Sequence, residues 1–202
     1  MVVPLLGLSL AANAVGAGAA VVLVRRRGGL RGLLRRPGGG PPFPRADPGT
    51  VVLAGDSHVE HAPLLELLTP YRQCGVAGQT VDEVAAWLPA VVGPDVHAVV
   101  LAAGTNDVLH GATADEVAAR CVRLLDRLPD VPVVLLGIPR LDGHERAAEE
   151  ADAALRRLCV ARGLAFLPLT TGGGGDGIHL TRADYRALAP ALLAAVEGLP
   201  ER

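Results

Sequence analysis

From residue 50 onward, short strand-like runs alternate with longer segments whose apolar residues recur at helical spacing. The strand-like runs lie at 51–54, 71–74, 97–103, 131–138 and 164–167. The third run carries no polar residue after His97, as expected of a strand that is buried on both faces. Helices between buried strands indicate a parallel sheet with helices on both faces and right-handed crossovers, so we predict the α/β class.

The segments between these runs carry the signals of helix ends. Thr80, Thr113 and Thr181 each stand where an N-cap residue is expected. Thr113 and Thr181 are each followed three residues later by an acidic residue, which is the capping-box pattern. The predicted helices lie at 64–68, 80–88, 113–128, 145–162 and 181–196.

The first 48 residues differ in composition from the rest of the chain. Residues 1–24 contain no charged side chain, and a helix of that length is about 36 Å long, enough to cross a hydrocarbon core of about 30 Å. Six arginines follow between residues 25 and 36, and the Pro- and Gly-rich stretch at 37–44 can hold neither helix nor strand. We therefore predict an apolar helix at 1–24 (a transmembrane anchor or signal segment), a linker at 25–48, and one domain at 49–202.

Three interpretations of residues 1–24 stay open. A membrane anchor matches the length, and the arginines that follow would keep the main domain cytoplasmic by the positive-inside rule. A cleaved signal peptide, which would make the protein secreted, normally has its positive charge before the apolar stretch, although the sequence AGA at 17–19 offers a cleavage site. The third interpretation is a loosely folded apolar tail or a core helix. We favour a membrane-associated protein with one N-terminal pass.

Composition excludes several classes of function. A net charge of −2 and an aromatic content of 2% are untypical of nucleic-acid-binding proteins, so we predict no nucleic-acid partner. The three cysteines, Cys74, Cys121 and Cys159, are odd in number and show no paired spacing. We expect them to be small buried hydrophobes and not a disulfide framework or a zinc site.

Two motifs hold the residue types of nucleophilic catalysis. Parallel sheets bind ligands beyond the carboxyl ends of their strands, and the sequence GDSH at 55–58 follows the first predicted strand. Ser57 in this turn is a candidate nucleophile. The sequence DGIH at 176–179 precedes the last helix, and Asp176 can hold one nitrogen of His179 while the other faces a hydroxyl. Taken alone, each motif also matches an ordinary turn or helix start.

Two further motifs can supply hydrogen-bond donors to a developing negative charge. The sequence GVAG at 75–78 follows the second predicted strand, and a glycine lets a backbone N–H approach a substrate closely. The sequence GTND at 104–107 follows the third, where the amide of Asn106 is a neutral donor. Each is also compatible with a plain turn, but four such motifs at strand ends in this order are unlikely to be an accident.

The four motifs together resemble the four conserved blocks of the SGNH (GDSL-type) hydrolases, over about residues 50–197. The resemblance implies a flavodoxin-like three-layer α/β/α sandwich with five parallel strands in the order 2-1-3-4-5. It also implies hydrolysis of carboxylic esters or thioesters of small or lipid-like molecules, with no metal or cofactor. By the same resemblance Ser57 is the nucleophile, His179 the general base and Asp176 its orienting carboxylate. The oxyanion hole would comprise the N–H of Ser57, the N–H of Gly78 and the side chain of Asn106.

The chain departs from the family pattern in the first two blocks. The first block reads GDSH where the family has GDSL, and Gln79 stands where many members carry Asp. His58 and His61 have a spacing seen in zinc ligand pairs, but no further ligand set is evident, so we expect them to line the mouth of the site. Two other functions stay open, an acyltransferase on the same scaffold and a non-catalytic, membrane-tethered binding module.

Overall fold

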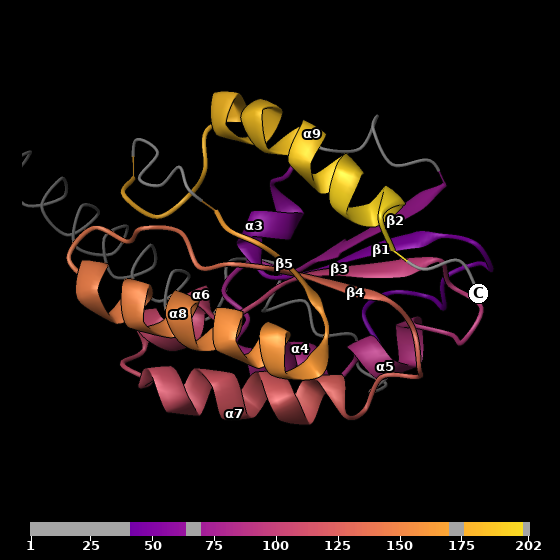
Figure 1. The fold of residues 1–202 in the computed structure, drawn as a ribbon, viewed down its shortest axis with the longest axis horizontal. Helices are drawn as coiled ribbons and strands as arrows, with labels where there is room; N and C mark the ends of the chain where they lie inside the picture. The colour runs from indigo at the N-terminus through magenta and orange to yellow at the C-terminus, as the bar shows by residue number, and fades with distance from the viewer. Residues whose placement is uncertain (1–40, 64–69, 170–175, 200–202) are drawn as a thin grey trace, which may run out of the picture. The chain divides into compact units, whose positions relative to one another are not determined.

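The structure is a computed structural model that describes residues 41–63, 70–169 and 176–199. These residues contain one sheet of five parallel strands in the order β2-β1-β3-β4-β5 (Figure 1). The strands are β1 (Val51–Gly55), β2 (Tyr71–Gly75), β3 (Ala98–Ala102), β4 (Val133–Leu136) and β5 (Ala165–Leu167). The predicted class and strand order are confirmed.

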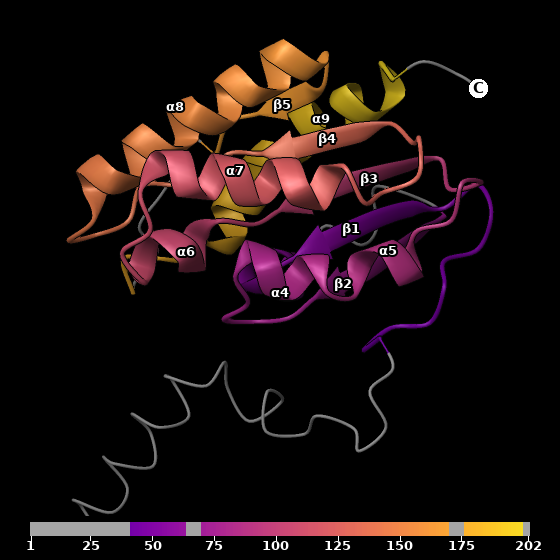
Figure 2. The same cartoon turned by 90° about the horizontal axis from the view of Figure 1, so that it is seen from below.

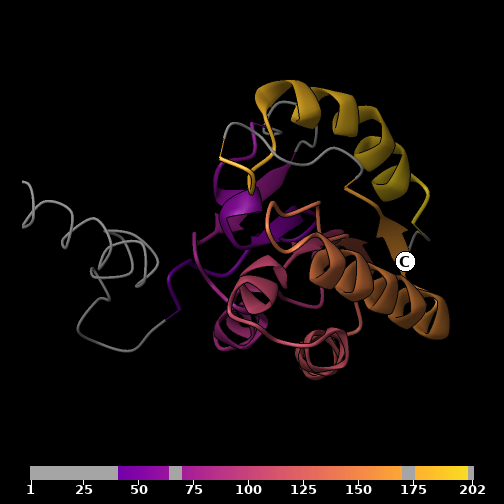
Figure 3. The same cartoon turned by 90° about the vertical axis from the view of Figure 1, so that its left-hand side faces the viewer.

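Helices cover both faces of the sheet, so that the described residues form three layers (Figures 1 and 3). One face carries α3 (Ser57–Glu60) and α9 (Arg182–Glu197). The other carries α4 (Val81–Ala85), α5 (Leu88–Val91), α6 (Thr105–Leu109), α7 (Ala114–Leu125) and α8 (Glu145–Arg162), which Figure 2 shows from their own side. Successive strand residues alternate between two apolar clusters: Leu53 packs with α9, while Val52 packs with α4 and α7. This alternation follows from the two-residue period of a strand.

The helix ends follow the predicted caps, with one difference. Thr80, Thr113 and Thr181 all form capping boxes with the acidic residue three positions later. The predicted helix at 80–88 is two helices, because α4 ends at Ala85 and α5 begins at Leu88. Pro89 lies in the first turn of α5, and a proline there has no N–H to continue the hydrogen bonds of α4.

Residues 41–48 form neither helix nor strand, yet they pack on the domain. The ring of Phe43 lies 5.2 Å from that of Trp87, and the N–H of buried Ala46 donates to the carbonyl oxygen of Val91 at 2.8 Å. The apolar helix predicted at 1–24, the rest of the linker up to residue 40, and the helix predicted at 64–68 lie outside the described residues. Among the helices that are described, none has the length and apolarity needed to span a bilayer.

The carboxyl ends of β2, β1 and β3 meet where the sequence requires glycine. Gly55 ends β1 between Gly75 of β2 and Ala102 of β3. Its φ is +148°, and a Cβ at this position would lie 1.8 Å from the carbonyl oxygen of Ala102. Because only glycine accepts this approach, β1 can turn directly into the loop that carries Ser57.

Candidate active site

Ser57 is the first residue of α3, immediately after β1. Asp56 is the N-cap of this helix, and its Oδ1 accepts a hydrogen bond of 2.9 Å from the N–H of His58. Only 5% of Ser57 is exposed. The tight turn therefore holds the serine at the carboxyl edge of the sheet, with its backbone fixed by the cap.

Three side chains from the two ends of the domain form a hydrogen-bonded chain at this edge. Ser57 Oγ lies 2.9 Å from Nε2 of His179, although 122 positions separate the two residues. His179 Nδ1 lies 2.5 Å from Oδ2 of Asp176. An ionised carboxylate can only accept, so Nδ1 carries the proton and Nε2 offers its lone pair to the serine hydroxyl. This arrangement is the one that a hydroxyl needs in order to lose its proton to an imidazole.

The other oxygen of Asp176 is held by the backbone of its own turn. Oδ1 accepts hydrogen bonds from the N–H groups of His179, at 2.9 Å, and Ile178, at 3.0 Å. The hydrogen bond from the backbone N–H of His179 is the largest cause that holds the pKa of Asp176 well below its usual range. The carboxylate is thus charged at every physiological pH and has a fixed orientation toward the imidazole.

Gly78 and Asn106 follow the two strands that flank β1. Gly78 lies in the loop between β2 and α4 with a φ of +79°, a left-handed conformation that favours glycine. Asn106 lies in the first turn of α6, and its Nδ2 donates a hydrogen bond of 3.0 Å to the carbonyl oxygen of Gln79. The structure therefore brings both residues to the strand ends that neighbour Ser57, and it links the two motifs directly.

Further polar contacts hold the loop between β2 and α4 that contains Gly78. Ala77 N–H donates to a carboxylate oxygen of Glu60 at 2.5 Å, and Val81 N–H donates to the fully buried Asp107 at 2.9 Å. Asp107 also pairs with Arg120 at 2.6 Å. The sequence reasoning missed these supporting roles, although Asp107 belongs to the motif GTND that it singled out.

Two buried ionisable side chains, those of Asp56 and His58, flank Ser57 in the chain. His58 is 3% exposed, its ring centroid lies 5.6 Å from that of His179, and its carbonyl oxygen accepts a hydrogen bond of 2.8 Å from the hydroxyl of Tyr185. Burial, with a further effect of His179, lowers the pKa of His58 to about 4. Burial also raises the pKa of Asp56 to about 7, against the opposing hydrogen bond from His58. Both groups are therefore mostly uncharged near pH 6.

We expected His58 and His61 to line the mouth of the site. This expectation is wrong for His58 and agrees with the position of His61. His58 does not line the mouth of the site, because it is buried in α3, where its carbonyl oxygen accepts the hydrogen bond from Tyr185 of α9. His61 is exposed, and its ring centroid lies 5.4 Å from that of His179. Across residues 41–63, 70–169 and 176–199, no three His, Cys, Asp or Glu side chains are grouped so as to hold a metal ion. The three cysteines are free and buried.

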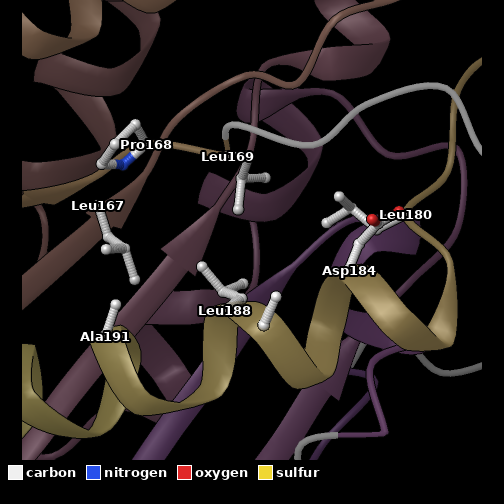
Figure 4. Close-up of a pocket in the computed structure, with 8 residues that line it drawn as sticks. Leu167, Pro168, Leu169, Leu180, Asp184, Leu188 and Ala191 are labelled. Carbon is white, nitrogen blue, oxygen red and sulfur yellow. The ribbon is translucent and has the colours of Figure 1, made fainter.

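An apolar cavity of about 220 Å³ lies between the end of β5 and α9 (Figure 4). Its walls are Leu167, Pro168, Leu169, Leu180, Asp184, Ala187, Leu188 and Ala191. Leu180 directly follows His179 in the chain, so one end of the cavity adjoins the loop that carries the imidazole.

The chain is similar to known proteins in sequence and in fold. A model of the GDSL-like lipase/acylhydrolase family matches residues 49–187. The native aryl esterase of M. smegmatis has 19% identity and a TM-score of 0.66, and the match covers 75% of this chain and 100% of that chain. A lipolytic G-D-S-L family protein from Veillonella parvula has 17% identity and a TM-score of 0.63, and the match covers 74% of this chain and 99% of that chain. Est24, a carbohydrate acetylesterase from Sinorhizobium meliloti, has 18% identity and a TM-score of 0.58, and the match covers 73% of this chain and 98% of that chain. No curated protein matches the chain.

At these identities the solved structures establish the fold alone. The family match extends over more than half of the chain and includes all four motifs. The chain therefore belongs to the GDSL-like lipase/acylhydrolase family and is an ester-cleaving serine hydrolase.

Proposed function

We propose that this hydrolase cleaves carboxylic esters of small or lipid-like molecules through an acyl-serine intermediate on Ser57. The observation that carries the proposal is the chain of hydrogen bonds from Ser57 through His179 to Asp176, at 2.9 Å and 2.5 Å. Nothing in this step requires a metal or a cofactor, because the imidazole moves the proton and the carboxylate stabilises the imidazolium.

In the first half-reaction Ser57 Oγ forms a bond to the ester carbonyl carbon while Nε2 of His179 takes the hydroxyl proton. The carbonyl oxygen becomes an oxyanion, which accepts hydrogen bonds from the N–H groups of Ser57 and Gly78 and from the amide of Asn106. The C–O bond to the alcohol then breaks, and the proton on His179 passes to the leaving oxygen. The products are a free alcohol and an acylated Ser57.

In the second half-reaction a water molecule takes the place of the alcohol. His179 removes a proton from the water as its oxygen bonds to the acyl carbon, and the same donors stabilise the second oxyanion. The bond to Ser57 Oγ breaks, and the serine recovers its proton from His179. The net reaction is ester plus water to acid plus alcohol.

The exposure of the site supports substrates with varied leaving groups. The side chain of His179 is 31% exposed and that of Asp176 is 53% exposed, so that the base lies close to the surface. Two structural neighbours are described as an aryl esterase and a carbohydrate acetylesterase. Aryl esters and sugar esters differ chemically in the alcohol part of the molecule. We therefore propose short-chain acyl esters of aryl or sugar alcohols as the first substrates to test.

The experiment that tests this function is active-site labelling of the full chain. The chain has two serines, Ser9 and Ser57, so a fluorophosphonate adduct can be assigned by peptide mass. We expect a single adduct on Ser57, turnover of p-nitrophenyl acetate by the wild type, and loss of both in Ser57→Ala. Val160→Ala is the control, because Val160 is 80% exposed on α8, and it should behave as wild type. A Ser57→Ala variant that still hydrolyses the ester, or a wild type that neither labels nor hydrolyses, would overturn the proposal.

We also propose that residues 1–24 anchor the protein in a membrane, with the hydrolase domain in the cytoplasm. The absence of charge over 24 residues and the six arginines that follow support this proposal. The full chain should sediment with membranes and resist carbonate extraction, whereas a chain that lacks residues 1–24 should stay in the soluble fraction. Recovery of an N-terminally shortened protein in the medium would instead indicate a cleaved signal segment.

A further inference from the structure

Gln79 stands directly after Gly78, in the position where many family members carry an acid, and the structure gives it three hydrogen bonds, of which two reach beyond its own loop. Its carbonyl oxygen accepts from Nδ2 of Asn106 at 3.0 Å. Its side-chain Oε1 accepts from Nε1 of Trp87 at 2.7 Å. One residue therefore connects the glycine of the second motif, the amide of the third motif, and a tryptophan that the sequence motifs do not include.

Trp87 is a rigid partner for this contact. It is 5% exposed, it belongs to the apolar cluster under the sheet, and the ring of Phe43 packs 5.2 Å from it. An indole has one N–H, which can only donate, so the packed ring offers a single donor in a fixed direction. The hydrogen bond from Trp87 therefore fixes the side chain of Gln79 to the core of the domain.

The hydrogen bond to Asn106 fixes the orientation of a group that we assign to the oxyanion hole. A planar amide has two N–H donors, and when one of them bonds to the Gln79 carbonyl the direction of the other is set. The Gly78–Gln79 segment lies midway along a loop that is also held at Ala77 and Val81. The N–H of Gln79 also donates to the carbonyl oxygen of Val76 at 3.3 Å, which closes the backbone turn, and the contact with Trp87 ties the side chain of the same segment to the core.

We propose that Gln79 and Trp87 are positioning residues, which hold the Gly78 N–H and the Asn106 amide in the geometry that stabilises the oxyanion. The proposal rests on the function given above, because it assigns a task to donors that matter only if Ser57 is acylated. It concerns the transition state and not the binding of substrate. It therefore predicts a loss in kcat with little change in KM.

The test is a double-mutant cycle on p-nitrophenyl acetate with the full chain. Trp87→Phe removes the donor and keeps an aromatic ring, while Gln79→Met removes the acceptor and keeps the length of the side chain. Each should lower kcat roughly tenfold, less than the roughly 10²- to 10³-fold loss expected when an oxyanion donor is deleted outright. The double variant should be no slower than the slower single variant, because both changes remove the same hydrogen bond.

A trifluoromethyl ketone provides the readout that a merely structural role would not change. It forms a hemiketal oxyanion on the serine, so its affinity should fall by the same factor as kcat/KM in each variant. Cys159→Ala is the matched control: it trims a buried side chain of the same apolar cluster on α8 but leaves the hydrogen bond between Trp87 and Gln79, and its kcat should stay within about twofold of wild type. The melting temperature of every variant shows whether it is folded at the assay temperature.

The possible outcomes separate this proposal from the proposed function. Losses in kcat that multiply in the double variant, a loss confined to KM, or an unchanged affinity for the ketone would each overturn the positioning role. If Trp87→Phe does not fold, Gln79→Met decides, because Gln79 is partly exposed and outside the core. Failure of the function itself would appear earlier, as a wild type that is not labelled at Ser57.

Discussion

Replacement of Asp176 by Asn converts one carboxylate oxygen of the side chain that holds His179 into an NH₂ group. The surrounding hydrogen bonds determine which of the two oxygens is replaced. Oδ1 accepts from two backbone N–H groups, those of Ile178 and His179. An amide NH₂ group in the position of Oδ1 would place its own N–H donors against these two backbone N–H donors. The Asn side chain should therefore keep its oxygen there and place its NH₂ group where Oδ2 now meets Nδ1.

The imidazole must then change its tautomer. Nδ1 can accept from the new NH₂ group only if its proton moves to Nε2, and a protonated Nε2 cannot take the proton of Ser57. In serine hydrolases this wrong tautomer lowers kcat by about 10⁴, which corresponds to about 5.5 kcal/mol of the barrier. The loss of stability should be much smaller, about 1–2 kcal/mol, because the two backbone hydrogen bonds persist.

The assay for Asp176→Asn is kcat on p-nitrophenyl acetate together with the rate of fluorophosphonate labelling, and both should fall together. Asp142→Asn is the matched control, since Asp142 is an exposed carboxylate whose backbone contacts the same turn. It should stay within about twofold of wild type. An Asp176→Asn variant with more than a tenth of wild-type kcat would refute the assigned tautomer and the role of His179 as base.

Two further predictions follow from the same strand ends. Asn106→Ala should lower kcat about 10²- to 10³-fold, or about 2.7–4 kcal/mol, with little change in KM; steady-state kinetics measure it, and a loss below tenfold would remove Asn106 from the oxyanion hole. Gly55→Ala should destabilise the fold by more than about 3 kcal/mol, because a Cβ would lie 1.8 Å from the Ala102 carbonyl oxygen at a φ of +148°. Urea denaturation measures this loss, and wild-type stability would contradict the close approach.

The sequence predicted those parts of the fold that follow from local pattern. Buried strands are visible as apolar runs, and three helix starts were predicted from a threonine cap, two of them with an acid three residues later; the structure adds the same capping box at Thr80. The strand order came from the family resemblance, since no local signal states which strands are neighbours. The helix predicted at 80–88 is broken between Ala85 and Leu88, because the helical spacing of apolar residues continues through Leu88 while Pro89 has no N–H with which to continue the hydrogen bonds of α4.

The sequence predicted which three side chains meet at the site and not the residues that support them. Ser57, His179 and Asp176 belong to short motifs with recognisable chemistry, and the resemblance of the four motifs to one family singled them out. The contact of Gln79 with Trp87 joins a loop to a core side chain, and nothing in the spacing of the two residues distinguishes it from many other pairs. The hydrogen bond from the Tyr185 hydroxyl to the carbonyl oxygen of His58 likewise joins residues that lie 127 positions apart.

The pH dependence of stability provides a test of Asp56 and His58, the buried pair on either side of Ser57. The pKa of Asp56 rises from 3.8 to about 7 on folding, so the folded state binds more protons than the unfolded state between these values, and this group makes the free energy of unfolding fall as pH rises. The pKa of His58 falls from 6.5 to about 4, so this group makes the free energy of unfolding rise with pH over that interval.

Between pH 4 and 6.5 the two slopes, each about 1.4 kcal/mol per pH unit, oppose each other and largely cancel in the wild type. Asp56→Asn keeps the N-cap and removes the falling slope, so its stability relative to wild type should increase with pH. His58→Leu removes the rising slope, so its stability relative to wild type should decrease with pH. Urea denaturation at pH 4.5, 5.5 and 6.5 measures both differences. Two differences that change with the same sign, or that stay constant, would mean that the carboxyl and the imidazole are not both buried uncharged beside Ser57.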